Sequence, residues 1–188
     1  MAKGQNRIPG EPGVWLLIFG EMTVFAVLFA SFLRARHGDV AGFLVGQAHL
    51  SKGIGIANTL LLLTSSLFVA KAVEAVRLGD TTRAPRLFAS GLACAAGFVL
   101  LKALEYTQLF EQGYSVGSHP FFGWYFGLTA LHLGHVLAGS VLLSVLTLVS
   151  RKPLTRPLHL ALTESAGCFW HMVDLLWIVI FALIYLVE

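Results

Sequence analysis

A histidine and an aspartate interrupt the closing apolar segment of the chain. His171 and Asp174 are three residues apart, so in a helix they share one face and can reach each other or a neighbouring helix. Such a pair could act as an acid and base, or contribute ligands to a metal. No nucleophile and no further ligand set completes either mechanism, and we therefore favour a hydrogen-bonded structural pair.

A carboxyl group and two further histidines also lie within apolar segments. Glu21 follows Pro12 by nine residues, roughly 13 Å into a helix that begins there. A carboxyl group at that depth in hydrocarbon needs a partner, and we expect His132 or His135 to supply it. The contact is either a polar tie between helices or a proton-handling site. Histidines are also common ligands of haem and copper, but no other motif of a cofactor-binding pocket accompanies these.

Uncharged polar residues on one segment, and a stripe of Ala and Gly on another, predict contacts between helices. Asn58 and Ser65 are seven residues apart on one helix face and can hydrogen-bond across helices. Ala130, Gly134 and Ala138 form a stripe of small residues, which predicts close approach of a second helix.

Two acid–base pairs lie nearer to the ends of apolar segments. Lys71 precedes Glu74 by three residues, and Lys102 precedes Glu105 by the same spacing. We expect each pair to neutralise itself and to extend towards the membrane interface.

The elements that must position these residues are five apolar spans. They cover residues 14–33, 54–76, 87–109, 122–149 and 166–187, bounded by Gly, Pro or charged residues. Each is long enough to cross a bilayer as a helix. The sequence therefore predicts an all-α bundle of five transmembrane helices that forms one domain over residues 1–188.

Composition supports the membrane assignment. The chain is 56% hydrophobic and only 12% charged, with a mean hydropathy of +0.77, whereas soluble domains are roughly 25% charged. The net charge of +3 comes from basic residues in short loops, so we expect no nucleic-acid partner.

The distribution of basic residues predicts the orientation. The amino terminus and the second and fourth loops carry Lys3, Arg7, Arg77, Arg83, Arg86, Arg151, Lys152 and Arg156. The opposite side carries Arg34, Arg36 and Lys52. By the positive-inside rule the amino terminus is cytoplasmic and the carboxyl terminus lies outside.

Four motifs, in order along the chain, resemble cytochrome c oxidase subunit III. They are GEM at residues 20–22, NT with LTSS at 58–66, LHLGHVLAG at 131–139, and WHMVDLLW at 170–177 preceded by Glu164. The resemblance covers the chain from about Arg7 onward. The chain lacks the first two helices of the long mitochondrial-type subunit.

Within that family the chain looks most similar to a short branch. RIPGEPGVW at residues 7–15, ALEY at 103–106 and FFGWYF at 121–126 resemble the NorE-type proteins found beside bacterial nitric oxide reductases. Met172 stands where the family has an aromatic residue, and Ala130 where it has glycine. These departures also favour a divergent branch.

The resemblance implies a subunit without redox centres in the bacterial plasma membrane. Such a subunit packs beside a haem-copper catalytic subunit, which holds the haem and copper, and supports its assembly, its phospholipid environment and proton entry. Glu21 would be the intramembrane carboxylate, with His132 and His135 opposite it. Glu164, His171 and Asp174 would form the polar set of the last helix.

Three alternatives remain open from the sequence. An accessory protein of nitric oxide reductase would keep the fold and change the partner. A small transporter or proton channel acting alone would need a continuous polar path, whereas the polar residues here occur in patches. An autonomous haem protein would show a Soret band, and we expect none.

Overall fold

All regular elements in the part of the chain described by the computed structural model, residues 10–152 and 157–187, are helices. They are α1 (Pro12–Gly38), α2 (Val40–Ala48), α3 (Lys52–Arg77), α4 (Arg83–Glu111), α5 (Pro120–Val149), α6 (Pro157–Phe181) and the short π-helix η1 (Ala182–Leu186). Five of the helices, α6 being counted together with η1, are long and apolar enough to cross a membrane. The expected all-α fold with five spans is confirmed.

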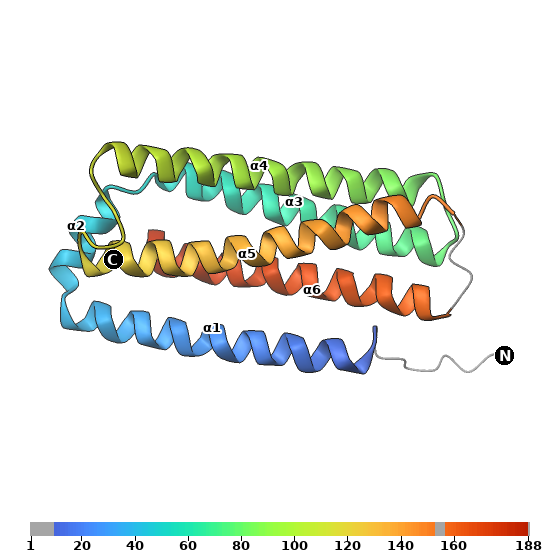
Figure 1. The fold of residues 1–188 in the computed structure, drawn as a ribbon, viewed down its shortest axis with the longest axis horizontal. Coiled ribbons are helices and arrows are strands. Elements are labelled where there is room, and N and C mark those ends of the chain that lie inside the picture. The colour runs from blue at the N-terminus through green and yellow to red at the C-terminus, as the bar shows by residue number, and fades with distance from the viewer. Residues whose placement is uncertain (1–9, 153–156, 188) are drawn as a thin grey trace.

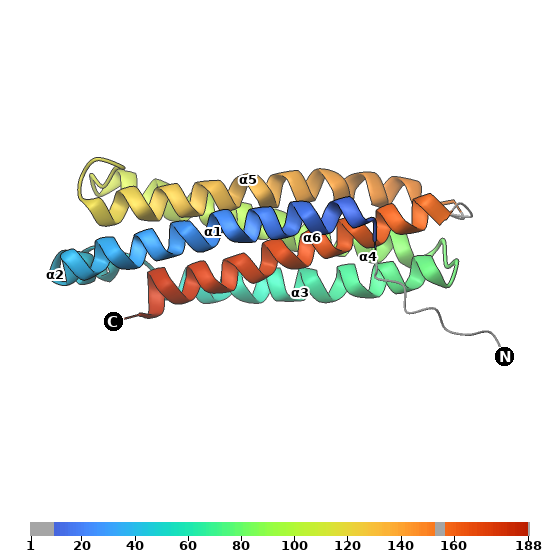
Figure 2. The same ribbon diagram turned by 90° about the horizontal axis from the view of Figure 1, so that it is seen from below.

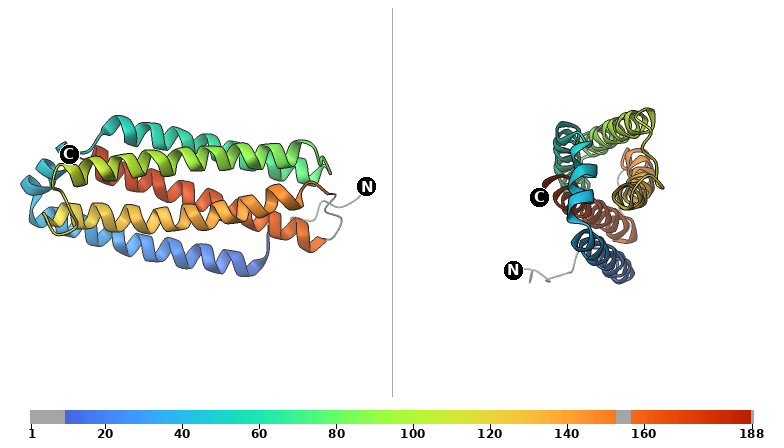
Figure 3. Two further views of the ribbon diagram at one scale, coloured as in Figure 1. Left: turned by 45° about the horizontal axis from the view of Figure 1, so that its top comes forward. Right: turned by 90° about the vertical axis from the view of Figure 1, so that its left-hand side faces the viewer.

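Four of the long helices form a compact bundle, and the first lies at its edge. Figure 1 shows α3 and α4 side by side above α5 and α6, and the end view in Figure 3 places α1 beyond α6. Of the most apolar window of each helix, 17% of the residues are buried in α1 but 61% in the last span. The last helix is therefore the centre of the bundle, and α1 presents most of its surface outward.

Local sequence explains where the helices begin and end. Pro12 and Pro120 lie in the first turns of α1 and α5, where a missing N–H is tolerated. The Ser51 hydroxyl accepts a hydrogen bond from Ile54 N at 3.3 Å and caps α3. Gly79 and Gly113 follow α3 and α4 with φ of +71° and +85°, a conformation that glycine adopts without strain.

The helices exceed the apolar spans, and one helix was not expected. α1 continues from Leu33 to Gly38, and α6 begins at Pro157 rather than at Ala166. Backbone hydrogen bonds extend a helix into polar sequence, so hydropathy marks the hydrocarbon and not the helix end. Residues 34–53 contain the short helix α2, which Asp39 caps by accepting from Gly42 N at 3.0 Å.

The core depends on close approach between α6 and its neighbours. A Cβ at Gly139 of α5 would lie 2.6 Å from the Trp170 ring, and one at Gly55 of α3 would lie 2.7 Å from Phe181. Glycine at these positions lets the bulky rings of α6 lie against the facing backbones. These two close contacts contribute to the rotation that α6 adopts in the bundle.

Candidate functional site

Glu21 and His135 meet where α1 packs against α5. Glu21 Oε2 lies 3.2 Å from His135 Nε2, and the two side chains are 30% and 15% exposed. α1 runs antiparallel to α5, as Figure 2 shows, so that residues near the middle of each helix lie at one depth. The expected contact of Glu21 with one of the paired histidines is thus present, with His135.

The two ring nitrogens of His135 face different groups. Nδ1 lies 2.9 Å from the Leu131 carbonyl oxygen, which can only accept a hydrogen bond, and Nε2 lies 3.2 Å from Glu21 Oε2. An imidazole and a carboxyl group in contact are residue types that can pass a proton between them.

His132 points away from Glu21, contrary to the expectation that both histidines oppose it. Its ring is fully buried, 5.3 Å from the Trp177 ring and 5.7 Å from the Phe98 ring, measured between centroids. Residues three apart are rotated by about 60° around a helix, which is enough here to direct one towards α1 and the other into the bundle. Neither imidazole nitrogen of His132 has a partner among the described residues.

His171 and Asp174 do not form the dyad that their spacing permits. The Nδ1 atom of His171 lies 2.6 Å from the Ser66 hydroxyl of α3. Asp174 is only 4% exposed; the Ser66 hydroxyl is a polar neighbour of its carboxyl group, but no hydrogen bond of good geometry reaches either carboxyl oxygen within the described ranges. The expected satisfied pair is therefore half correct, because His171 has a partner on α3 and Asp174 does not.

Glu164 lies at the end of the bundle, ten residues before Asp174. Its oxygens accept from Arg77 Nε at 2.9 Å and from Gly10 N at 3.1 Å. Glu11 N donates to the neighbouring Ser165 hydroxyl at 2.9 Å. These contacts fasten the start of α1 to α6 and α3. The polar residues of the last helix are therefore separated, with Glu164 about 15 Å along the helix from Asp174.

Ser65 and the two tryptophans of α6 link α3 with its neighbours. Ser65 donates to the Gly91 carbonyl oxygen at 2.9 Å and accepts from Trp170 Nε1 at 3.1 Å. Trp177 Nε1 donates to the Thr59 hydroxyl at 3.1 Å. Asn58 is fully buried on the same helix, but none of the described residues hydrogen-bonds to its amide.

The stripe of small residues on α5 does not pack against another helix of this chain. Ala130, Gly134 and Ala138 are all exposed, and a Cβ added at Gly134 would meet nothing within 4 Å. The expected helix packing at this stripe is thus wrong within the chain. The face of α5 that packs inward instead carries His132, Val136 and other bulky residues, which are buried.

Lys102 and Glu105 form a buried network that sequence reasoning missed. Their side chains are 1% and 2% exposed and 2.7 Å apart, so the expectation that they extend to the interface is wrong. Lys102 Nζ also donates to Tyr185 at 2.9 Å and to Tyr125 at 3.3 Å. Tyr185 in turn donates to Glu105 at 2.8 Å.

Aromatic rings complete the surroundings of the Lys102 ammonium group. The Tyr125 and Trp177 ring centres are 4.8 Å and 5.0 Å from Nζ. The depth of Lys102 was the available signal, because nine residues separate it from the end of α4, about 13 Å, which exceeds the reach of a lysine.

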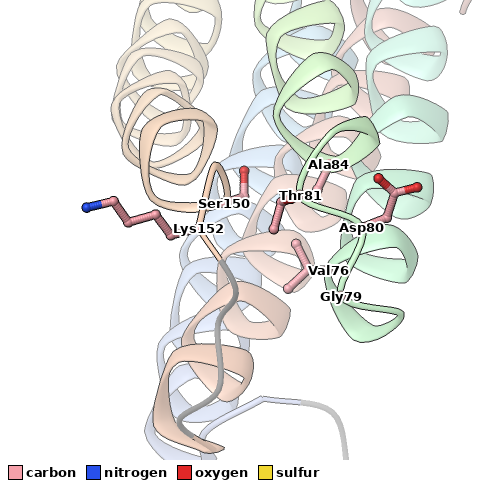
Figure 4. Close-up of a pocket in the computed structure, with 7 residues that line it drawn as sticks. All are labelled: Val76, Gly79, Asp80, Thr81, Ala84, Ser150 and Lys152. Carbon is pink, nitrogen blue, oxygen red and sulfur yellow. The ribbon is translucent and has the colours of Figure 1, made fainter.

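A small, open cleft lies at the end of the bundle where α3 turns into α4. Figure 4 shows the Asp80 and Lys152 side chains directed away from each other on opposite sides of it. Arg83 N and Thr82 N donate to Asp80 and, helped by the Arg83 charge, hold the pKa of that carboxyl below its ordinary value. The cleft contains none of the residues singled out from the sequence.

The described residues contain no group of three or more His, Cys, Asp or Glu side chains that could hold a metal ion. The histidines of the spans each face a different neighbour. Their arrangement suits hydrogen bonding between helices, as at the contact of Glu21 with His135.

Comparison with known proteins places this arrangement in a family. Residues 10–188 match the family cytochrome c oxidase subunit III. The chain is 29% identical over 187 residues to cytochrome c oxidase subunit 3 of Corynebacterium diphtheriae, covering 97% of this chain and 91% of that protein. It is 30% identical over 187 residues to the protein of the same name in Bacillus sp. strain PS3, covering 98% and 87%. It is 28% identical over 175 residues to quinol oxidase subunit 3 of Bacillus spizizenii, covering 93% and 85%.

Proposed function

Because the chain belongs to the cytochrome c oxidase subunit III family, we propose that it is an accessory subunit without redox centres in a bacterial haem-copper respiratory oxidase. In this role it packs beside the catalytic subunit, which holds the haem and copper. It supports the assembly and stability of that subunit and its supply of protons. The protein lies in the bacterial plasma membrane with its amino terminus in the cytoplasm.

The contact between Glu21 and His135 carries the proton-handling part of the proposal. The pair is at mid-depth, brings a carboxyl group and an imidazole into contact and keeps 30% of the Glu21 side chain exposed. An ionisable group facing hydrocarbon is costly, so this edge of α1 and α5 is suited to being covered by a partner subunit or by lipid. Proton exchange with that partner then needs no path across the whole chain.

The outward faces of α1 and α5 support association with a partner and with phospholipid. Exposed residues there are almost all apolar, and the Ala130, Gly134 and Ala138 stripe offers no bulky side chain. Small residues allow helix backbones of two subunits to approach closely. The remaining apolar surface is suited to acyl chains.

Affinity purification tests the partner. We expect the tagged chain, extracted from native membranes in mild detergent, to co-purify with a haem-containing catalytic subunit. After separation, we expect the haem absorption to stay with the partner. Recovery of the chain alone, or a Soret band that travels with it, would overturn the proposal. The latter result would instead favour an autonomous haem protein.

Substitution of Glu21 tests the proton-handling role. Glu21→Gln keeps the shape but removes the exchangeable carboxyl proton, so turnover of the purified complex should fall several-fold while the complex stays assembled. Glu74→Gln, at an exposed position of α3, is the matched control and should leave turnover unchanged. Unchanged turnover and stability in the Glu21 variant would reduce that residue to a dispensable tie.

A NorE-type accessory protein of nitric oxide reductase is the second candidate. The segments at residues 7–15, 103–106 and 121–126 favour it. The same purification distinguishes the two, because the co-purified complex would reduce nitric oxide rather than oxygen. A small transporter acting alone is the third candidate, and it would show proton or solute flux in vesicles that contain this chain only.

A further inference from the structure

Three buried polar side chains in the middle of the bundle have no hydrogen-bond partner among the described residues. They are Asn58 on α3, His132 on α5 and Asp174 on α6. Asn58 and His132 are 0% exposed and Asp174 is 4% exposed. Neither the lipid nor a partner subunit can therefore reach Asn58 or His132. The unsatisfied atoms are both polar atoms of each side chain.

Trp177 places the three side chains at one level of the bundle. Its ring lies 5.3 Å from the His132 ring, and its Nε1 donates at 3.1 Å to Thr59, the residue next to Asn58. Asp174 precedes Trp177 by three residues, about 4.5 Å along the helix axis and on the same side of α6. The residues of α3, α5 and α6 that carry the unsatisfied groups therefore lie within about one helical turn of one another along the bundle, in one layer near the level of Trp177.

Leaving these groups unpaired would be costly. A buried polar group without a partner costs about 1 to 3 kcal/mol of stability. Lipid acyl chains cannot form the hydrogen bond that water would supply. Native proteins satisfy nearly all such groups, commonly with ordered water that makes about three hydrogen bonds. A layer with three polar side chains from three helices offers that number of partners.

We propose that this layer, defined by Asn58, His132 and Asp174, binds ordered water inside the bundle. Water can donate to the Asp174 carboxyl group, to the Asn58 amide oxygen and to the bare imidazole nitrogen of His132. It can accept from the Asn58 amide N–H and from the other imidazole nitrogen. The layer differs from the Lys102 network, where the protein side chains already satisfy one another.

Water fits the layer better than a metal ion. The three side chains offer one carboxyl group, one imidazole and one amide, and no group of metal-binding side chains was found among the described residues. A water molecule can hydrogen-bond to all three, because it both donates and accepts hydrogen bonds and these side chains present both donors and acceptors. The site needs no partner chain, so its test does not depend on the proposed oxidase role.

Radiolytic labelling tests the proposal directly. Brief X-ray exposure of the full chain in nanodiscs makes hydroxyl radicals from bound water, and mass spectrometry locates the modified side chains. Trp177 and His132 should be labelled several-fold more than Trp170. Trp170 is a matched control, because it lies on the same helix, is also 0% exposed and donates its N–H to Ser65. Equal labelling of the two tryptophans would overturn the proposal.

The sign of a stability change provides a second test. In a dry layer, His132→Leu removes an unpaired polar group and should raise the thermal unfolding midpoint. In a hydrated layer it removes a water ligand and should lower the midpoint and the labelling of Trp177. Asn58→Leu should behave likewise, and the double variant should lose less than the sum. A raised midpoint in either single variant contradicts the proposal, and the labelling of the unmodified chain decides the matter if a variant fails to fold.

Discussion

Two acid–base contacts lie inside the spans: Lys102 with Glu105, and Glu21 with His135. They differ in how many of their hydrogen-bonding atoms have partners within the chain. Lys102 has three oxygen partners and is 1% exposed, whereas Glu21 has one described partner and is 30% exposed. The first pair sits among α4, α5 and η1, and the second joins the loosely packed α1 to α5.

Under the proposed function, this difference separates a structural use of charge at Lys102 and Glu105 from a functional one at Glu21 and His135. A pair whose hydrogen bonds are all directed inward can hold helices together, but it has no free capacity to exchange a proton with a neighbour. A pair with one contact and an exposed edge should contribute less to stability, and under the proposed function it exchanges a proton with a neighbouring subunit. We therefore expect substitutions at the first pair to affect folding and substitutions at the second to affect turnover.

The largest effect should come from breaking the saturated pair on one side. Lys102→Met leaves the buried Glu105 carboxylate without its cation and should destabilise the chain by about 3 to 5 kcal/mol. Thermal unfolding in detergent and the amount of protein in membranes both measure it. The double change to Lys102→Met with Glu105→Leu should recover most of the loss. A stable single variant would show that the pair is not the structural one.

Tyrosine hydroxyl groups should give the next effect. Tyr185 donates to Glu105 and accepts from Lys102, so Tyr185→Phe should cost about 1 to 3 kcal/mol of unfolding free energy. Tyr125→Phe removes only the longer 3.3 Å contact and should cost less. The order of the two unfolding midpoints checks this, and the reverse order would contradict the network as described.

The partly exposed pair should show weak coupling in stability. A double-mutant cycle with Glu21→Gln and His135→Gln should give a coupling energy of about 0.6 kcal/mol, typical of hydrogen bonds between membrane helices. Turnover of the complex should respond much more than stability. A coupling energy as large as the effect at Lys102 would remove the distinction between the two pairs.

The smallest effect should come from an exposed pair outside the spans. Asp80 accepts a hydrogen bond from the backbone N–H of Arg83, the first residue of α4, and its carboxyl group lies 3.4 Å from the Arg83 side chain, which is 80% exposed. Its pKa is lowered in the folded chain, so its contribution is present at neutral pH and is lost as the pH falls through that value. Asp80→Asn should abolish this small acid dependence of the unfolding midpoint. A dependence that persists in the variant would assign it to other carboxyl groups.

Hydropathy and depth were enough to predict much of the fold. The apolar spans, their number and the need of Glu21 for a partner all follow from what hydrocarbon excludes. The helix α2 could not be predicted, because its nine residues are too short to show a span and its place depends on Phe43 packing against Phe32 and Phe121. The π-helix at residues 182–186, which positions Tyr185, carried no local signal.

Sequence by itself determined which segments are apolar enough to span a membrane, since span length and residue type decide that locally. Only the tertiary structure decided which of them meet. The rotation of α5 directs His135 to Glu21 and His132 to Trp177, and the π-helix η1 brings Tyr185 to Lys102 across 83 residues. The reason is that helix rotation is set by the sum of packing contacts, to which no single residue or spacing corresponds.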